Sequence, residues 1–421
     1  MRNHKKKGIT LAKALRIQRN DVVSFVGGGG KTTSMFRLAD ELSAAGWRVV
    51  TTTTTHISQE QVGFAPVSIV IDEIDSLTAH LDAWGQCLII GAPDGKGRVF
   101  GASSEFIAAL IARTDVDAVL VEADGSRSRP FKAPGEYEPV VPEATTILVP
   151  VVGLNAMGRP LDEDHVHRSQ IAAKLAGVPV GSPITAGVIA RVLYHPEGGA
   201  KALPAGARLV PILNRADTAD DVAKARGLAE KLLGSPSIDC VLINSMKRSP
   251  SVIEACKTVT GVVLAVGKDS RRGDTSLVTQ TVRTADDAGL DHVVVVLGHD
   301  AENVQAALAG MRIRCAWNRD FSEGECSFFR KGIHALPPWA GAAVFLNPDH
   351  PSNTPGTIRA LVEAHRCTLA PACVPGHGEK TGYPVLFDQT IFKELSELSG
   401  EYSLRDLLRK YADEVVSVPI D

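Results

Sequence analysis

The chain has 421 residues, and its 45 Lys and Arg against 48 Asp and Glu give a formal net charge of -3 at pH 7. This charge argues against a nucleic acid held by bulk electrostatics, and no apolar run approaches the ~20 residues that cross a bilayer, so neither a nucleic acid nor a membrane is expected as a partner. The seven cysteines are scattered without a CxxC pair, which indicates reduced thiols in a cytoplasmic protein rather than disulfides or a zinc site.

The first ~250 residues alternate apolar runs of strand type with helical patterns, which predicts a parallel α/β sheet. A helix is expected over Met35–Ala45, because its apolar spacing is helical and Gly46 follows it. The predicted strands of this part are Val22–Val26, Arg48–Thr52, Cys87–Ile90, Ala118–Glu122, Thr146–Val151, Ala186–Val192, Arg208–Leu213 and Asp239–Ile243.

A second α/β series begins near residue 260. Its predicted strands include Gly261–Ala265, His292–Leu297 and Ala342–Leu346. The preceding segment, Ser245–Lys257, contains no strong breaker of secondary structure. Because a chain of this length holds two or three domains, we place a boundary between the two series and expect one domain over residues 1–257 and another over residues 258–421.

The most informative stretch is VVSFVGGGGKTT, residues 22–33, in which an apolar run leads through four glycines into Lys-Thr-Thr and a helical pattern. Bare backbone N–H groups at a helix start can cradle a phosphate. Lys31 would reach the outer phosphates of a nucleotide, and Thr32 would ligate Mg²⁺. A flexible strand-to-helix turn is the structural alternative, but Lys-Thr directly after the glycines favours nucleotide binding. The residues expected to bind the nucleotide here are Gly27, Gly28, Gly29, Gly30, Lys31, Thr32 and Thr33.

The loop does not fit the commonest phosphate-binding pattern. In G-x-x-x-x-G-K-[ST] the first glycine would fall at Phe25. The chain instead offers the shorter G-x-x-G-K-T-T from Gly27, which resembles the compressed loop of ATP-dependent Mur-type ligases. The stretch therefore predicts phosphate binding without fixing the subclass of P-loop.

A nucleotide with its metal ion needs an acidic partner, and the run Val119–Gly125 supplies one. It is an apolar strand that ends in Glu122 and Asp124, a Walker-B-like arrangement in which either carboxylate holds Mg²⁺ directly or through water. An acidic strand end that faces solvent is the alternative. Lys31, Asp124 and Glu122 are thus the candidate catalytic residues, and Thr32 and Asp124 are the candidate metal ligands of this domain.

Other polar residues of the first domain give weaker signals. Arg127, Arg129 and Lys132 suit an anionic ligand and, nearly equally, a solvated basic turn. Thr51–Thr55 is a hydroxyl run at the carboxyl end of a strand, where ligands bind in open α/β sheets, although β-branched residues also simply favour strands. The histidines of Asp164–His167 lack a third ligand in register, so a metal site is not expected there.

A base-recognition signal follows in the expected order behind the loop and the acidic strand. The strand Leu209–Leu213 leads into Asn-Arg-Ala-Asp, which resembles the N-K-x-D signature of GTPases. In that signature Asp217 would accept hydrogen bonds from the N1–H and amino group of guanine, and Asn214 would brace the loop. Arg215 replaces the usual lysine and would cover the base similarly. This signal favours GTP and the short loop favours ATP, and we prefer GTP of the two.

The N-terminal part carries six ordered motifs: VGGGGKTT, VVTTTTTHI, VEADGSRSRPFKAP, GEYEPVVP, VHR and LNRAD. Over about residues 15–256 they resemble the YqeC-type accessory proteins of selenium-dependent molybdenum hydroxylases. The resemblance implies a cytosolic NTPase-like protein that helps to mature a molybdenum hydroxylase, and hence an apo molybdenum hydroxylase as partner. We therefore expect a P-loop NTPase-like parallel sheet domain that binds GTP or ATP with Mg²⁺.

The C-terminal part is similar to MocA/MobA-type nucleotidyltransferases over about residues 261–421. The segment VVLAVGKDSRRG is similar to the L-A-A-G-x-S-x-R-M-G loop that wraps a nucleoside triphosphate, and five further segments match in order, from VVVVLGHDAENVQAAL to LSGEYSLRDLL. That family couples molybdopterin to CMP or GMP with release of pyrophosphate. The resemblance implies a Rossmann-like (GT-A-like) α/β domain in which Gly267, Arg271 and Asp349 bind the ligand and Asp349 holds Mg²⁺.

Several motifs depart from that family. The lysine that neutralises the triphosphate aligns with Ser276, G-D-Q-P reads P-D-H-P at 348–351, G-H-P reads G-Y-P at 382–384, and G-D-x-G-x-R loses a glycine at 400–405. Losing a charge-assisted contact to a polyanion removes about 2–4 kcal/mol of transition-state stabilisation. We therefore expect a domain that binds molybdopterin or molybdopterin cytosine dinucleotide but catalyses poorly or not at all, unless Lys268 substitutes.

These patterns together predict a nucleotide-dependent accessory protein in the maturation of molybdenum hydroxylases, with GTP or ATP hydrolysis in the first domain. Two alternatives stay open. In one, the second domain is an active molybdenum cofactor cytidylyltransferase that the first domain regulates. In the other, the chain is a non-catalytic, nucleotide-gated chaperone that holds the dinucleotide cofactor and docks on the apo-hydroxylase.

Overall fold

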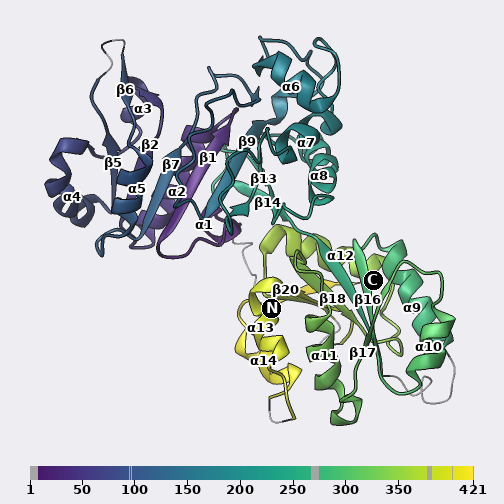
Figure 1. Cartoon of the computed structure of the whole chain (residues 1–421). Coiled ribbons are helices and arrows are strands. Elements are labelled where there is room, and N and C mark those ends of the chain that lie inside the picture. The colour runs from purple at the N-terminus through teal and green to yellow at the C-terminus, as the bar shows by residue number, and fades with distance from the viewer. Residues whose placement is uncertain are drawn as a thin grey trace. The chain divides into compact units, whose positions relative to one another are not determined.

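The computed structural model describes residues 8–93, 95, 97–266, 275–376, 382–400 and 402–420. The chain separates into two compact units, Lys7–Cys256 and Lys257–Asp421. Each unit has a central sheet with helices packed on it (Figure 1). Two of the expected ligand-binding residues, Gly267 and Arg271, lie outside the described residues, as does Lys268.

The N-terminal unit is built on a ten-stranded sheet. Its strands are β1 (Asp21–Gly27), β2 (Val49–Thr53), β4 (Ser68–Val70), β5 (Gln86–Ile90), β7 (Ala118–Glu122), β9 (Ile147–Gly153), β11 (Arg208–Leu209), β12 (Ile212–Asn214), β13 (Val241–Asn244) and β14 (Val252–Cys256). They lie in the order β14-β13-β12-β9-β1-β7-β2-β5-β4, with β11 beside β9. The pairs are parallel except β13 with β14. The sheet is therefore mixed only at one edge.

Two small sheets flank the main one, β3 (His56–Ser58) with β6 (Arg98–Phe100) and β8 (Phe131–Lys132) with β10 (Val166–His167). The helices of this unit are α1 (Leu11–Ala14), α2 (Lys31–Ala44), α3 (Gln59–Val62), α4 (Leu77–Trp84), α5 (Ser104–Ile111), α6 (Ser169–Ala176), α7 (Ala186–Tyr194) and α8 (Ala219–Leu233). Helix α2 follows β1 directly and packs on β1, β2 and β7. The loop between β1 and α2 therefore lies at the carboxyl edge of the sheet, between the neighbouring strands β7 and β9.

The strand predicted over Ala186–Val192 is wrong, because this segment forms helix α7. Thr185 begins the helix, since its side chain accepts a hydrogen bond from the N–H of Val188. The apolar residues then recur at helical spacing, so that Val188, Ile189, Val192 and Leu193 are buried together. The antiparallel strand β14, in the segment without a strong breaker, was not predicted, and the strand expected over Arg208–Leu213 is interrupted between β11 and β12.

The C-terminal unit has a seven-stranded mixed sheet in which β17-β16-β15-β18 are parallel and β20 runs antiparallel to β18 and β19. Its strands are β15 (Val259–Ala265), β16 (His292–Leu297), β17 (Arg314–Trp317), β18 (Ala342–Leu346), β19 (Ala372–Gly376), β20 (Val385–Asp388) and β21 (Val416–Pro419). The helices are α9 (Ser276–Asp287), α10 (Ala301–Ala307), α11 (Glu325–His334), α12 (Pro355–Thr368), α13 (Phe392–Ser396) and α14 (Leu404–Lys410).

Alternate residues of the central strands of this second sheet enter two different cores. Val263 and Val344 belong to the core on one face, and Val262 and Phe345 to the core on the other. Burial on both faces is what a parallel α/β sheet requires, and it explains the continuous apolar runs in the sequence. Within the described residues of both units, none of the helices is long and apolar enough to cross a membrane.

Candidate functional site

The glycine loop, Gly27–Gly30, is held by close backbone packing. Gly29 and Gly30 have φ angles of +80° and +134°, in the region where residues with a side chain are strained. A Cβ on Gly29 would lie 2.3 Å from the backbone nitrogen of Gly153, and one on Gly30 would lie 2.2 Å from Nδ2 of Asn214. These glycines therefore have a steric reason to be present, in addition to the phosphate binding that the sequence predicts.

Helix α2 begins at Lys31, four residues before the predicted start at Met35. Gly30 caps it and offers no side-chain hydrogen bond. The first N–H groups of an α-helix have no partner inside the helix, and the helix dipole makes this end positive. The loop and the 14-residue helix therefore present unpaired donors at the carboxyl edge of the sheet. Thr33, another expected nucleotide-binding residue, is exposed on the first turn of α2.

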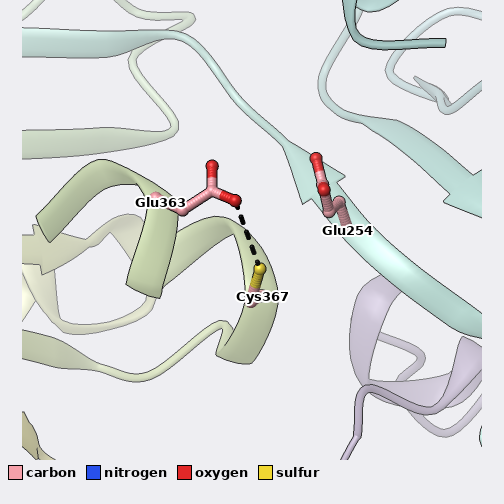
Figure 2. Close-up of side chains that lie close together, drawn as sticks. All are labelled: Glu254, Glu363 and Cys367. Atoms are coloured by element: carbon pink, nitrogen blue, oxygen red, sulfur yellow. Dashed lines mark hydrogen bonds between the residues drawn. The ribbon is translucent and has the colours of Figure 1, made fainter. Parts of the chain in front are cut away.

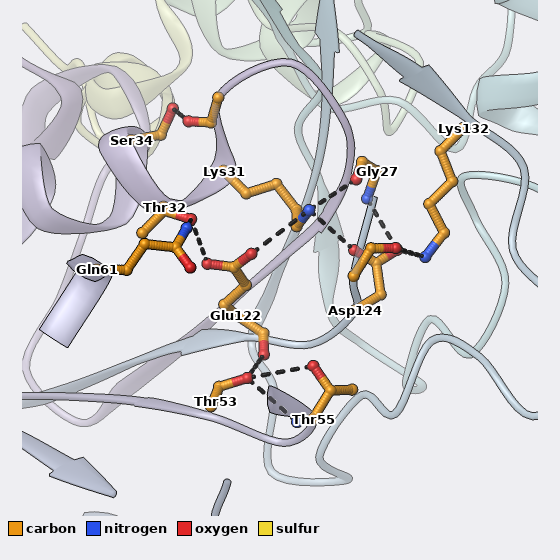
Figure 3. A network of polar contacts seen from close by, with 12 residues as sticks. Gly27, Lys31, Thr32, Ser34, Thr53, Thr55, Gln61, Glu122, Asp124 and Lys132 are labelled. Carbon is orange, nitrogen blue, oxygen red and sulfur yellow. Dashed lines mark hydrogen bonds and ion pairs between the residues drawn. The ribbon is translucent and has the colours of Figure 1, made fainter. Parts of the chain in front are cut away.

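Lys31 is buried among oxygen atoms at the start of this helix (Figure 3). Its Nζ donates a hydrogen bond to the carbonyl of Gly27 at 2.8 Å and lies 3.3 Å from Oδ1 of Asp124 and 3.5 Å from Oε1 of Glu122. Burial by itself lowers the pKa of Lys31, but the two carboxylates outweigh it, so the pKa of Lys31 is raised. Lys31 therefore keeps its positive charge beside the glycine loop.

The hydroxyl group of Thr32 and the carboxylates of Glu122 and Asp124 form a second part of the site. Thr32 donates to Oε2 of Glu122 at 2.6 Å and accepts a hydrogen bond from Gln61 of α3 at 2.9 Å (Figure 3). Asp124 is only 2% exposed, and among the described residues its Oδ1 has no contact with a hydrogen-bond donor other than the ion pair with Lys31 at 3.3 Å. Hydroxyl and carboxylate oxygens are the ligands that Mg²⁺ prefers, so Thr32, Glu122 and Asp124 fit this ion. Gln61 was not predicted, because nothing in its local sequence distinguishes it.

Lys132 lies on the opposite side of Asp124 from Lys31 (Figure 3). Its Nζ is 3.0 Å from Oδ2 of Asp124, and the same oxygen accepts a hydrogen bond from the N–H of Gly27 at 3.0 Å. Lys132 also contacts the carboxylate of Glu138 and the carbonyl of Gly125, and it is 3% exposed. Of the two interpretations left open for Lys132, a solvated basic turn is therefore wrong.

The carboxylate of Glu138 bridges two cations. Arg168 donates two hydrogen bonds to it, at 2.7 and 2.9 Å, while Lys132 contacts it from the other side. Burial raises the pKa of Glu138, but Arg168 and Lys132 outweigh this effect and lower the pKa to about 2.

The other two basic residues of the turn do not contact Asp124. Arg127 is exposed, and Arg129 lies 3.6 Å from the exposed Asp164. Of the three basic residues after the acidic strand, only Lys132 therefore contacts the carboxylate of Asp124.

The residues expected to recognise the base lie at and just beyond the end of β12, near the end of β13. Asn214 donates from Nδ2 to the carbonyl of Gly29 at 2.8 Å, so it contacts the glycine loop directly. Asp217 accepts hydrogen bonds from Ser245 and Lys247, both at 2.6 Å, and these two contacts lower its pKa. Ser245 and Lys247 were not predicted, because they lie 28 and 30 residues further along the chain.

The threonine run and the histidines have other contacts. Thr53 donates to the backbone carbonyl of Glu122 at 2.7 Å and so ties β2 to β7 (Figure 3). The ring of His56 packs against Phe100 with centroids 4.6 Å apart. His165 pairs with Asp162 at 2.7 Å, while His167 is buried in β10. Thr53, His56 and His165 thus each contact a residue of their own unit, and His167 is a buried part of β10.

In the C-terminal unit, Asp349 is exposed just beyond the carboxyl end of β18. Ser276, which the sequence motifs align with the lysine of MocA/MobA-type nucleotidyltransferases, is the first residue of α9. A cleft of about 510 Å³ lies beyond β17, and its lining includes Arg319, Arg330 and Lys331. The described part of this unit thus offers an acidic residue at the expected sheet edge and a cleft with basic groups.

The same unit buries a cluster of three charged or titratable groups, Lys257, His365 and Asp388. Oδ2 of Asp388 lies 2.7 Å from Nζ of Lys257 and 2.8 Å from Nε2 of His365. Burial lowers the pKa of His365; it raises that of Asp388, but His365 and Lys257 outweigh this and lower it. Asp388 is paired with Ala342, the first residue of β18, so the cluster lies at the amino edge of that strand.

Three further groups are drawn in Figure 2. Glu254 on β14 of the N-terminal unit accepts hydrogen bonds from Arg226 at 2.9 and 2.5 Å. Glu363 and Cys367 lie one turn apart on α12 of the C-terminal unit, where Sγ donates to Oε1 at 3.9 Å. Each of these groups is explained by a contact within its own unit.

Comparison with known proteins confirms both resemblances. The family described as YqeC protein matches residues 23–170, and the family described as MobA-like NTP transferase domain matches residues 262–415. Over 235 residues the chain is 31% identical to the uncharacterized protein YqeC of Escherichia coli (strain K12). The aligned region covers 56% of this chain and 91% of that protein. The chain therefore belongs to the YqeC family, and a nucleotidyltransferase-like domain follows its YqeC part.

Weaker likenesses are found to other proteins. The bifunctional protein GlmU of Corynebacterium aurimucosum is 30% identical over 120 residues, which are 25% of each chain. Among solved structures, Rv0371c of Mycobacterium tuberculosis H37Rv in complex with manganese is 26% identical over 39% of this chain and 89% of that chain, with a TM-score of 0.35. The two family matches support a nucleotide-related accessory role.

Proposed function

We propose that the N-terminal unit is a P-loop NTPase-like domain that binds GTP or ATP with Mg²⁺ and hydrolyses it. The observation that carries this proposal is the meeting of two chain segments. Lys31 and Thr32 begin α2, and they contact Asp124 and Glu122 at and just beyond the end of β7. A cation, a hydroxyl and two carboxylates at a helix start are the groups that a triphosphate with its metal requires.

Each residue of this set has a distinct task in the proposal. The N–H groups at the start of α2 donate to phosphate oxygens, and Lys31 neutralises the outer phosphates. Thr32 and Asp124 hold the metal ion, and Glu122 orients Thr32 through the 2.6 Å hydrogen bond between them. Bound Mg²⁺ supplies positive charge to the phosphate oxygens. Burial of these groups strengthens their interactions with a charged ligand, because little water screens them.

The nucleotide base lies in this proposal at the ends of β12 and β13. Asp217 accepts hydrogen bonds from guanine, and Ser245 and Lys247 fix its carboxylate through contacts of 2.6 Å. The amide of Asn244 and Oδ1 of Asn214 are buried there without hydrogen-bond partners, which leaves polar groups for a ligand to satisfy. These residues favour GTP over ATP.

The C-terminal unit binds molybdopterin or its cytosine dinucleotide in this proposal, with Gly267, Arg271 and Asp349 as ligand-binding residues and Asp349 as metal ligand. The nucleotidyltransferase-like fold supports a nucleotide or pterin ligand. Ser276 in place of a lysine supports weak or absent transferase activity. The whole chain then serves an apo molybdenum hydroxylase in the cytoplasm, whether or not that enzyme depends on selenium.

The experiment that tests the proposal is phosphate release from GTP and from ATP with Mg²⁺. Lys31→Ala should lower phosphate release by at least about 10²-fold, because it removes a charge-assisted contact to the phosphates. Lys224→Ala is the matched control, since Lys224 lies on α8 in a surface pair with Asp220. Equal phosphate release by the wild type and Lys31→Ala, or none by the wild type with either nucleotide, would overturn the proposal.

Two further assays separate the alternatives for the second domain. Pyrophosphate release from CTP with molybdopterin, lost in Asp349→Asn, would show an active cytidylyltransferase instead. Nucleotide-dependent association with an apo-hydroxylase in the absence of both activities would show a non-catalytic chaperone. Native mass spectrometry of freshly purified protein identifies any bound pterin or nucleotide.

A further inference from the structure

We infer that Lys132 is a catalytic residue of the proposed NTPase site, a second lysine whose ammonium group contacts the γ-phosphate during its transfer. This inference rests on the proposed function. The first observation is the position of Asp124, whose carboxylate stands between two lysines (Figure 3). Its Oδ1 lies 3.3 Å from Nζ of Lys31, and its Oδ2 lies 3.0 Å from Nζ of Lys132. A single anionic group is therefore already held from both sides at this place.

The second observation is that Lys132 belongs to the glycine loop's own surroundings. Oδ2 of Asp124 accepts from both Lys132 and the N–H of Gly27, each at 3.0 Å. The segment just before Lys132 packs on the loop, since a Cβ on Gly28 would lie 2.5 Å from the carbonyl oxygen of Arg129. One carboxylate oxygen of Asp124 therefore binds both the ammonium group of Lys132 and a backbone N–H of the loop.

The third observation is the charge balance around the loop. Five ion pairs connect the members of one chain of charges, and three cations face three carboxylates. The members are Lys31, Lys132, Arg168, Glu122, Asp124 and Glu138. A triphosphate with one Mg²⁺ would add net negative charge to this balanced set, and Asp124 would hold the metal ion. Lys132, which Glu138 holds from its other side, would then contact the γ-phosphate as it is transferred.

In the reaction, the oxygen of a water molecule bonds to the γ-phosphorus, and the bond from this phosphorus to the β–γ bridging oxygen breaks. The proton of the water passes to an oxygen of the departing phosphate, and the products are the nucleoside diphosphate and inorganic phosphate. The distribution of negative charge over the phosphate oxygens changes during this step, and a cation held beside these oxygens stabilises the transition state. In this inference Lys132 acts mainly on the transition state, because it contacts the phosphate only during the transfer.

The test separates turnover from binding in the full-length protein. Lys132→Met should lower kcat for phosphate release by about 10²- to 10³-fold and change KM by less than about threefold. Lys132→Arg should recover part of the loss. The nucleoside diphosphate with aluminium fluoride, which imitates the transferring phosphoryl group, should bind the Met variant at least about 10² times more weakly, while the diphosphate alone binds as to the wild type.

Lys201→Met is the matched control. Lys201 also donates to backbone carbonyls of this region, those of Gly135 and Glu136, at 2.7 and 2.9 Å. The variant Lys201→Met should leave phosphate release unchanged. Because Lys132 is buried between two carboxylates, the double variant Lys132→Met with Glu138→Gln is measured as well, since it removes one charge of each sign. It should show the same loss of kcat in a folded protein.

The outcomes distinguish this inference from the proposed function. If phosphate release depends on Lys31 but stays within threefold of the wild type in Lys132→Met and in the double variant, the role of Lys132 is overturned and the NTPase proposal stands. Equal losses in binding of the diphosphate and of its aluminium fluoride complex would show a purely structural lysine. No phosphate release by the wild type overturns both proposals.

Discussion

Each unit buries a cluster of charged side chains at one edge of its sheet, and the two clusters lie at opposite edges with respect to the parallel strands. In the N-terminal unit, Lys31 and Asp124 are 3% and 2% exposed and lie at the carboxyl edge, beside the glycine loop. In the C-terminal unit, Asp388 and its partner Lys257 are equally buried but lie at the amino edge of β15 and β18. Ligands of open α/β sheets bind outside the carboxyl ends of the strands. Burial alone therefore does not identify a site, and the sheet edge makes the distinction.

The difference also separates the two candidate metal ligands. Asp124 is buried and contacts Gly27, Lys31 and Lys132. Asp349 is exposed at the carboxyl end of β18. Because water screens a buried carboxylate less than an exposed one, we expect the N-terminal unit to carry the catalytic activity.

The largest expected effect concerns packing at the glycine loop. Gly29→Ala should destabilise the N-terminal unit by at least about 4 kcal/mol, because its Cβ would overlap the backbone of Gly153, which no rotamer change relieves. Gly289→Ala in the C-terminal unit is the control, since Gly289 has a φ of +81° and no atom within 4 Å of the added Cβ. It should cost only about 1–2 kcal/mol. Urea unfolding measures both, and equal costs would contradict the tight packing of the loop.

The second prediction compares the two acidic residues by phosphate release. Asp124→Asn should lower the rate by about 10²- to 10³-fold, because it removes the charge that pairs with two lysines and, in the proposed function, holds the metal. Asp349→Asn should leave the rate unchanged, since Asp349 belongs to the other unit. The opposite result would place the catalytic metal in the C-terminal unit and reverse the comparison.

The third prediction concerns the buried cluster of the C-terminal unit. The folded-state pKa of His365 is lowered by burial, so its contribution to stability is complete above about pH 6.5 and is lost as the pH falls. The lowered pKa of Asp388 acts in the same direction at more acidic pH. Between pH 7 and pH 5 the free energy of unfolding of this unit should fall, by at most about 2 kcal/mol, which is the limit for one group with an unfolded pKa near 6.5.

Hydrogen exchange of peptides from α12 measures this loss in the intact chain. His365→Gln should be less stable at pH 7 and should lose most of the pH dependence between pH 7 and pH 5. An unchanged slope in this variant would assign the pH dependence to other groups.

The smallest expected effect concerns guanine recognition. Lys247 is 79% exposed, so its pair with Asp217 is worth at most about 1 kcal/mol and Lys247→Ala should weaken GTP binding by less than about fivefold. Asp217→Ala should weaken it by about 10- to 100-fold, because hydrogen bonds to a charged group are lost, and should leave ATP binding unchanged. Calorimetric titration with both nucleotides distinguishes these cases, and equal weakening for ATP would refute guanine recognition by Asp217.

Much of the fold was predictable because the central strands are buried on both faces. Ala118–Glu122, His292–Leu297 and Ala342–Leu346 were predicted residue for residue, since such strands appear as continuous apolar runs. The same rule failed at Ala186–Val192, where a short apolar run fits a buried helix as well as a strand. Only the capping hydrogen bond to Thr185 and the spacing of the buried side chains decide the case.

The candidate site was predictable where residues stand at strand ends or in the loop, and not where distant segments meet. Lys31, Glu122 and Asp124 follow from parallel strands that end at one edge. Lys132 reaches Asp124 through a turn in which Arg127 and Ser128 have positive φ angles. Neither residue type favours that conformation, so the sequence indicates a turn but not the path that brings Lys132 to Asp124. The contact of Gln61 with Thr32 likewise depends on how α3 packs, which local patterns do not specify.

The hydrogen bond between Asn214 and Gly29 has a consequence for how the family can diversify. A side chain on Gly30 would lie 2.2 Å from the amide nitrogen of Asn214, so it would displace that amide from its hydrogen bond with Gly29. A homologue with alanine in place of Gly30 should therefore carry a smaller residue in place of Asn214. Paired substitutions of this kind, observed across an alignment, would record the steric coupling between the glycine loop and the end of β12.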